Sequence, residues 1–196
     1  MKKFLCILLT VVFIIGITGC SQDNVSKENS NYYSIMEEQK NNLVFNLNLD
    51  EFVENFNEKT EEGKNSLESD DFDNIGTGAL FFNPIESERY STNLGSHSMV
   101  VGMSDDNLTG VMLMTKSQEN VTDLFMTFSY TLEALNPEFS TEEASELAVE
   151  LINTSNSSNQ IYRKGMVIYV KITNSNIIFG AEAVTEEQYN QTIGTE

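Results

Sequence analysis

Carboxylates crowd one short segment of this 196-residue chain, and they are the first side chains with the chemistry to bind a ligand. Asp70, Asp71 and Asp73 offer the oxygen ligands that calcium prefers, so they are candidate ligands of a weak Ca²⁺ site in the acidic segment 68–73. The segment lacks the alternate spacing and the distal glutamate of an EF-hand loop, and a solvated acidic loop is the alternative. Paired carboxylates also cleave glycosidic bonds, but the chain has no tryptophan to line a sugar-binding groove.

His97 is the one histidine of the chain, and therefore the one imidazole that could act as a general base. It stands in Ser96-His97-Ser98 at the start of an expected strand, where a surface role is the more common one. No strand–turn–helix nucleophile motif accompanies it, so a hydrolase acting through His97 is an alternative and not the leading hypothesis. Zinc or copper needs several imidazole or thiolate ligands, and no glycine-rich phosphate loop is present. We therefore expect neither an enzyme nor a bound cofactor.

Cys20 belongs to the most specific motif of the sequence. Met1-Lys2-Lys3 precedes an apolar run over residues 4–17, and the run leads into Ile17-Thr18-Gly19-Cys20. Basic residues, an apolar stretch and a small-residue junction are typical of a secretory signal peptide. The run is shorter than the roughly 20 residues of a transmembrane helix, which is the alternative interpretation. Its last four residues resemble the lipobox of bacterial lipoproteins. The resemblance implies cleavage of residues 1–19 and a diacylglyceryl thioether on Cys20.

Charge and composition restrict the partners of such a protein. The formal net charge is −19, and it becomes −21 once Lys2 and Lys3 leave with the signal peptide. An acidic surface repels phosphate and anionic lipid, so we expect no nucleic-acid partner, and contact with the membrane only through the lipid on Cys20. Cys6 is lost with the signal and Cys20 is alkylated, so no disulfide is expected. Richness in Asn, Ile, Lys and Glu fits a Gram-positive host, where the lipoprotein stays on the extracytoplasmic face of the cell membrane.

The rest of the chain divides into a tether and one domain. Residues 20–42 are too polar to bury a core and indicate a flexible tether, whereas residues 43–196 are expected to form a single globular domain. Asn48 and Glu51 form a capping box, and Ser140-Thr141-Glu142-Glu143 forms a second. With apolar residues at helical spacing, these signals predict three helices. The expected helices cover residues 48–62, 117–135 and 140–152.

The remaining pattern is that of hairpin-connected strands. Val111 and Leu113 alternate with Met112 and Met114, which predicts a central strand covered on both faces or buried in an interface. Strands paired in hairpins favour an α+β fold, mainly an antiparallel sheet of about five or six strands with three helices, in the order α-β(3–4)-α-α-β-β. The expected strands cover residues 78–82, 89–92, 98–103, 108–115, 160–172 and 177–184, with a loop at 63–77. A capped helix precedes a β region twice, over residues 48–116 and 140–184. Identity between the two segments is too low to assign a repeat, and a duplicated α–β unit is an alternative interpretation.

These features together predict a membrane-anchored extracytoplasmic lipoprotein that acts as a non-catalytic protein-interaction module at the cell surface. It would bind another envelope protein, or a secreted one, through its sheet face or an exposed edge strand. Met99, Met103, Met112 and Met114 could contribute an adaptable binding face, although filling the core is the more common role of methionine. A small-ligand or calcium-binding lipoprotein is the alternative function.

Overall fold

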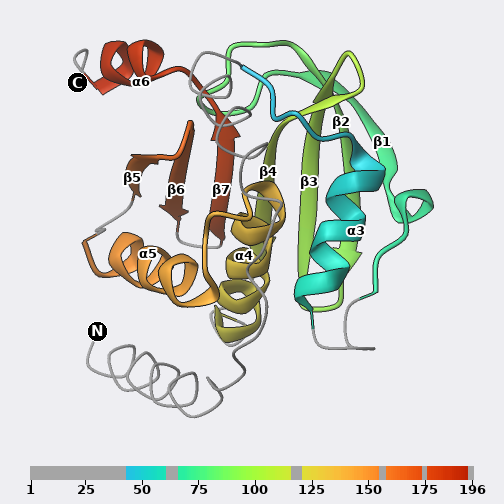
Figure 1. Cartoon of the computed structure of the whole chain (residues 1–196), viewed down its shortest axis with the longest axis horizontal. Coiled ribbons are helices and arrows are strands. Elements are labelled where there is room, and N and C mark those ends of the chain that lie inside the picture. The colour runs from blue at the N-terminus through green and yellow to red at the C-terminus, as the bar shows by residue number, and fades with distance from the viewer. Residues whose placement is uncertain (1–42, 61–65, 116–120, 155–157, 174–175, 194–196) are drawn as a thin grey trace, which may run out of the picture.

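The computed structural model describes residues 43–60, 66–115, 121–154, 158–173 and 176–193 (Figure 1). The predicted signal peptide, the lipidation site Cys20 and the predicted tether at residues 20–42 lie outside this part of the chain. The described strands form one antiparallel sheet in the order β1-β2-β3-β4-β7-β6-β5, which confirms the predicted α+β class. The strands are β1 (Asp73–Gly78), β2 (Ser87–Leu94), β3 (His97–Ser104), β4 (Asn107–Thr115), β5 (Ser158–Arg163), β6 (Met166–Ile172) and β7 (Ile177–Ala183).

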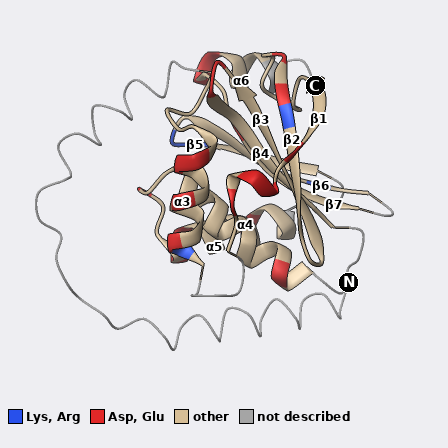
Figure 2. Cartoon of the chain, turned by 90° about the vertical axis from the view of Figure 1, so that its right-hand side faces the viewer, with Lys and Arg blue, Asp and Glu red and all other residues tan. Residues whose placement is uncertain are grey.

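Three of the helices pack on one face of the sheet (Figure 2). They are α3 (Leu49–Lys59), α4 (Val121–Leu135) and α5 (Thr141–Thr154), while α6 (Glu186–Ile193) follows the last strand. The predicted capping box at the start of α3 is confirmed: Asn48 Oδ1 accepts from the amide of Glu51 at 2.9 Å, and Glu51 Oε2 accepts from the amide of Asn48 at 3.0 Å. At the start of α5, Ser140 Oγ accepts from the amide of Glu143 at 3.2 Å. Local side chains therefore determine where these helices begin.

The main core lies between the sheet and these helices. Phe128 of α4 is fully buried and stacks on Phe179 of β7, with 4.7 Å between ring centroids. The predicted apolar stripe of α4 is buried along its whole length, and Thr127, Ser129, Thr131 and Glu133 between its members are buried as well. α4 contacts both α3 and α5, which explains why its other sides are also covered. The helix side of the sheet is therefore a packed interior.

Three strand boundaries differ from the sequence-based expectation. The expected loop at 63–77 contains β1 and a short 3₁₀ turn, Ser69–Asp71. Residues 79–82 of the expected strand at 78–82 form no strand, because their backbone turns across the sheet. The expected strand at 160–172 is a hairpin, since Lys164 (φ 51°) and Gly165 (φ 78°) reverse the chain between β5 and β6. The sheet consequently has one strand more than the upper expected number.

Candidate functional site

The candidate site lies on the back face, which we define as the sheet face opposite α3, α4 and α5. Strand registers align side chains of neighbouring strands in rows across this face. In one row Met114 of β4 lies beside Ile178 of β7, and Ile178 lies beside Lys171 of β6. In the adjacent row Met112 lies beside Val100 of β3. All five side chains are half-buried, and Met112 and Ile178 also pack against a small buried cluster around Tyr169, so a largely apolar strip remains partly accessible on the back face.

A strap, residues 79–86, connects β1 to β2 and crosses the back face above this strip. Gly102 of β3 and Gly110 of β4 are direct register partners, and Leu80 of the strap lies over them. A Cβ atom on Gly110 would lie 2.6 Å from Cδ1 of Leu80 and 3.0 Å from a backbone oxygen of β7. Glycine at these positions therefore provides the room that lets the strap lie directly on the sheet.

Glu182 of β7 holds the middle of the strap. Its side chain is fully buried, and its carboxylate accepts hydrogen bonds from three successive strap amides: Phe81 at 3.0 Å, Phe82 at 2.6 Å and Asn83 at 2.7 Å. The hydroxyl of Tyr169 donates a fourth hydrogen bond to Glu182 at 2.7 Å. Four donors satisfy both oxygens of the buried carboxylate, which compensates for the loss of water around it.

Asn83 holds the end of the strap and is itself buried. Its Nδ2 atom contacts three backbone oxygens, those of Leu43 (2.6 Å), Thr109 (3.2 Å) and Ala183 (2.7 Å). Its Oδ1 atom accepts from the amide of Ile85 at 2.9 Å and so shapes the following turn. Asn83 thus joins the first described residues of the chain to β4 and β7 at the upper end of the back face.

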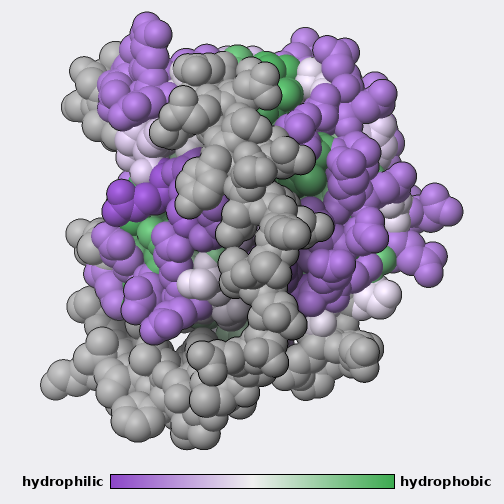
Figure 3. Space-filling view, in the orientation of Figure 1, coloured by the Kyte–Doolittle hydropathy of each residue, from purple (hydrophilic) through white to green (hydrophobic). Residues whose placement is uncertain are grey.

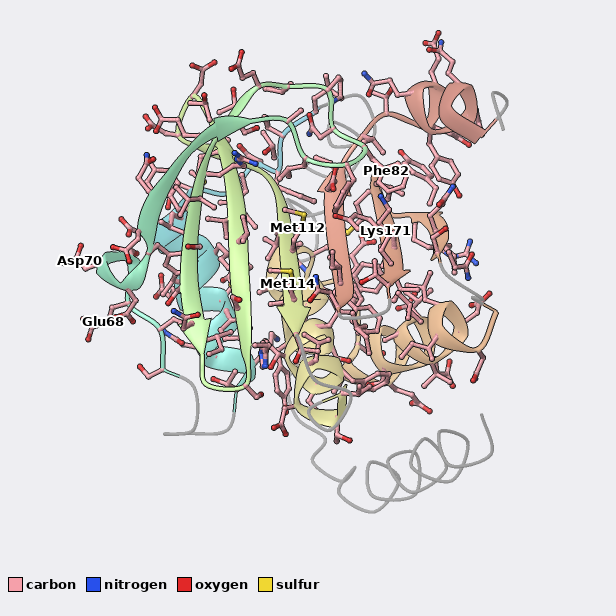
Figure 4. All side chains as sticks on the ribbon, turned by 180° about the vertical axis from the view of Figure 1, so that it is seen from behind. Glu68, Asp70, Phe82, Met112, Met114 and Lys171 are labelled. Atoms are coloured by element: carbon pink, nitrogen blue, oxygen red, sulfur yellow. The ribbon has the colours of Figure 1, made fainter. Side chains whose placement is uncertain are left out.

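The strap presents two phenylalanine rings beside the apolar strip. The ring of Phe81 meets that of Tyr169 edge-on at 5.7 Å between centroids, and the ring of Phe82 lies 5.0 Å from the same tyrosine. Phe81 is 47% exposed, which makes it one of two exposed large apolar side chains in the described part of the chain. Figure 4 shows Phe82 and Lys171 close together at one side of Met112 and Met114. We call the following residues the back-face patch: Phe81, Phe82, Val100, Met112, Met114, Lys171 and Ile178.

Lys171 gives the patch its charge. Its Nζ atom lies 3.9 Å from the centroid of the Phe81 ring, and no described carboxylate lies within ion-pair distance of it. The nearby carboxylate of Glu182 is buried under the strap, while Glu68 and Asp70 lie beyond the opposite edge of the sheet (Figure 4). The described surface on the helix side is mainly hydrophilic (Figure 3), with acidic residues on α3 (Figure 2). The glutamates of α6 lie elsewhere, because α6 packs through Tyr189 on Tyr162 at the back-face side of β5. The patch is thus apolar and locally cationic in a chain of net charge −19.

The edge strands of the sheet, β1 and β5, are less favourable binding surfaces than the back face. In β1 the register shifts between Asn74 and Gly76, with Ile75 as the extra residue and Gly76 at φ +99°. Such a bulge interrupts the row of backbone groups that a partner strand would use. At β5, the ring of Tyr162 stacks on the ring of Tyr189 from α6. The hydroxyl of Tyr189 donates to the backbone oxygen of Gln160 in β5 at 3.4 Å.

The predicted calcium ligands are spread over two elements. Asp70 and Asp71 lie in the 3₁₀ turn, where Asp71 accepts from the amide of Glu68 at 2.8 Å, and Asp73 begins β1 opposite Ser91. Within the described ranges, no three His, Cys, Asp or Glu side chains are grouped so as to hold a metal ion. Asp71 thus acts as a local cap in this structure, and the calcium site stays a prediction.

His97 is buried at the start of β3, which differs from the surface position typical of such residues. Its Nδ1 atom lies 3.1 Å from Ser96 Oγ, and its buried Nε2 atom has no hydrogen-bond partner among the residues described. Burial lowers the pKa of His97, and the charge of Asp123 opposes this effect only in part. A catalytic serine–histidine pair needs a third group that orients the imidazole, and no such group contacts the ring in the part of the chain described.

The methionines divide between the two faces of the sheet. Met99 is fully buried in the main core and Met103 packs against that core, whereas Met112 and Met114 belong to the back-face patch. Sequence reasoning missed the other patch residues and Glu182. One signal was present, because Glu182 is a lone carboxylate within an apolar strand, which indicates a buried charge with dedicated partners.

Within the described residues, no helix combines the length and apolar character that spanning a bilayer requires. The sequence matches no family model, and no curated protein or solved structure is significantly similar to it.

Proposed function

We propose that this protein is an extracytoplasmic lipoprotein, anchored to the cell membrane through Cys20, whose domain is a non-catalytic module that binds another protein through the back-face patch. The observation that carries the proposal is the patch itself: accessible apolar side chains beside two phenylalanine rings held by a buried hydrogen-bond network. Accessible apolar groups next to fixed aromatic rings are typical of protein interfaces.

The chemistry of the patch indicates the kind of partner. Lys171 has no carboxylate partner in the described structure, and Met112 and Met114 offer adaptable apolar contacts. An envelope or secreted protein that presents an apolar segment next to a carboxylate would satisfy both features. The net negative charge of the chain does not prevent this approach, because exposed charges beyond about 8 Å are screened at physiological ionic strength.

Photo-crosslinking in living cells tests the proposal. A photoreactive residue replaces Met114 in the full-length, C-terminally tagged protein, and it replaces the exposed Glu142 of α5 as the matched control. We expect one envelope or secreted protein to be captured from position 114 and not from position 142. Cys20→Ala, which cannot be lipidated, should lower the yield because it removes the protein from the membrane surface.

Charge reversal then tests the assignment of the patch. Lys171→Glu should reduce capture from position 114 by about tenfold, because it opposes the expected carboxylate of the partner, whereas Lys171→Gln should have a smaller effect. Equal capture from positions 114 and 142, or capture that does not respond to Lys171→Glu, would show that the back-face patch is not the binding site.

A further inference from the structure

Glu182 is a charged side chain at a position where burial is costly. It is a fully buried carboxylate on a sheet, surrounded by Tyr169, the glycine pair and the strap. Burial of a carboxylate is unfavourable unless dedicated donors replace the water that it loses. An apolar side chain at this position would fill the same space but would leave three strap amides and the Tyr169 hydroxyl without this acceptor, so the question is which part of the strap depends on Glu182.

The strap has other attachments on both sides of the segment that Glu182 binds. Leu80 rests on the glycine pair before this segment, and Asn83 binds backbone oxygens of β4 and β7 after it. The part that lacks these attachments is Phe81-Phe82, and the amides of these two residues are bonded to Glu182. Glu182 therefore acts on the segment that carries the aromatic rings of the patch.

The geometry restricts how these rings can lie. Consecutive amides directed at one carboxylate leave the backbone of Phe81-Phe82 little freedom, and Tyr169 contacts both rings while donating to the same carboxylate. Lys171 is in turn placed over the Phe81 ring. One buried carboxylate thus sets the relative positions of the two rings, and through Phe81 it affects the one cation of the patch.

We infer that Glu182 is a positioning residue that holds Phe81 and Phe82 in the orientation in which the partner is bound. This inference rests on the proposed function. Rings that are ordered before binding lose less conformational entropy when the partner docks, so the Glu182 hydrogen bonds raise affinity without any contact between Glu182 and the partner. Glu182→Gln keeps the shape of the side chain but directs an amide NH₂ group toward the strap donors, so it should release Phe81-Phe82.

The test combines hydrogen exchange with photo-crosslinking, both on the full-length protein. In Glu182→Gln we expect faster amide exchange in residues 81–83 and about tenfold less capture of the partner from position 114. Leu151→Ala is the matched control, because Leu151 of α5 is fully buried in the main core. This variant should lower the overall stability but leave amide exchange in the strap and capture of the partner as in the wild type. Tyr169→Phe, which keeps the ring and removes one donor, should change both readouts in the same direction but less, and it substitutes if Glu182→Gln does not fold.

The outcomes separate the two proposals. Unchanged exchange in residues 81–83, or faster exchange with undiminished capture, would overturn the positioning role while leaving the patch as a binding site. If the wild-type protein gives no capture that depends on the patch, the proposed function fails, and the exchange data then decide only whether Glu182 orders the strap. An equal loss of capture in Leu151→Ala would show that Glu182 acts through general stability.

Discussion

The hydroxyl of Tyr169 on β6 donates a 2.7 Å hydrogen bond to Oε1 of Glu182 on β7, and both side chains are almost completely shielded from solvent. Burial and the adjacent carboxylate raise the pKa of Tyr169 well above its ordinary value, so the phenol remains a donor throughout the physiological range. The bond joins the two strands on the back face and completes the set of donors around Glu182.

Removal of this hydroxyl should destabilise the protein. Tyr169→Phe leaves one oxygen of a buried carboxylate with a single donor, which should lower the free energy of unfolding by about 1.5–3 kcal/mol. Tyr162→Phe is the matched control, because its hydroxyl is also buried but has no hydrogen-bond partner in the described structure, and its loss should be neutral or slightly stabilising. Urea unfolding of both variants measures the difference, and equal midpoints would contradict the assigned bond.

Gly180 is expected to be essential for the position of Tyr169. A Cβ atom at residue 180 would lie 2.3 Å from the phenol oxygen and from Cζ of Tyr169, so Gly180→Ala must displace the ring. We expect a loss of about 1–3 kcal/mol in stability from this overpacking, measured by thermal or urea unfolding. Gly78→Ala is the control, since the atoms nearest its Cβ belong to the movable guanidinium of Arg89, at 3.0 Å or more. Similar losses in both variants would argue against a specific fit at residue 180.

Glu133 should destabilise the protein at neutral pH. Burial raises its pKa, while a hydrogen bond with Thr141 and the charge of Lys59 act in the opposite direction. A carboxyl whose pKa is raised on folding contributes stability that is fully present below its ordinary value of 4.5 and is lost as pH rises through the folded value. Glu133→Gln should therefore be more stable than the wild type at pH 7, and the gap should close toward pH 4. Urea midpoints across this range measure the difference, with the exposed Glu142→Gln as the control variant.

His97 should make the protein less stable in mild acid. Burial lowers its pKa, so the unfolded chain binds the proton more tightly, and the stabilising contribution is full above pH 6.5 and declines as pH falls below it. In the Glu133→Gln variant, the urea midpoint should fall as the pH is lowered from 7.5 to 6.5 and 5.5. In the double variant that also carries His97→Gln, the midpoint should fall less over the same pH range. A slope that His97→Gln leaves unchanged would place the acid sensitivity elsewhere.

The helices and one hairpin were predictable because their signals are local. The Asn48–Glu51 capping box begins α3 as expected, and the β3–β4 turn falls at the predicted residues, with Asp105 and Asp106 at positive φ. Aspartate tolerates this conformation and is typical of two-residue hairpin turns. The turn between β5 and β6 was missed because a lysine, Lys164, occupies the corresponding position.

The strap and the patch could not be predicted in the same way. Leu80-Phe81-Phe82 has the composition of a buried strand. The amides of Phe81 and Phe82, however, donate to the carboxylate of Glu182, which lies 101 residues after Phe81 in the chain. Lys171 and Phe81 likewise meet only through the order and register of the strands. Contacts of this kind depend on tertiary structure, and a local sequence pattern carries no information about them.

The position of β4 beside β7 has a consequence for how this protein folds, unfolds and aggregates. β1–β4 form one meander and β5–β7 another, and only the pairing from Gly110–Glu182 to Thr115–Ile177 joins them within the sheet. The chain between β4 and β7 runs from Thr115 to Ile177, and closing such a long loop costs more chain entropy than forming a hairpin. We therefore expect the β4–β7 pairing, which we call the seam, to form late in folding. Destabilising substitutions in the β4–β7 pairing should then mainly increase the unfolding rate and have little effect on the folding rate. A molecule opened at the seam would expose β4 and β7 as unpaired apolar edges, which makes that opening the expected route to aggregation.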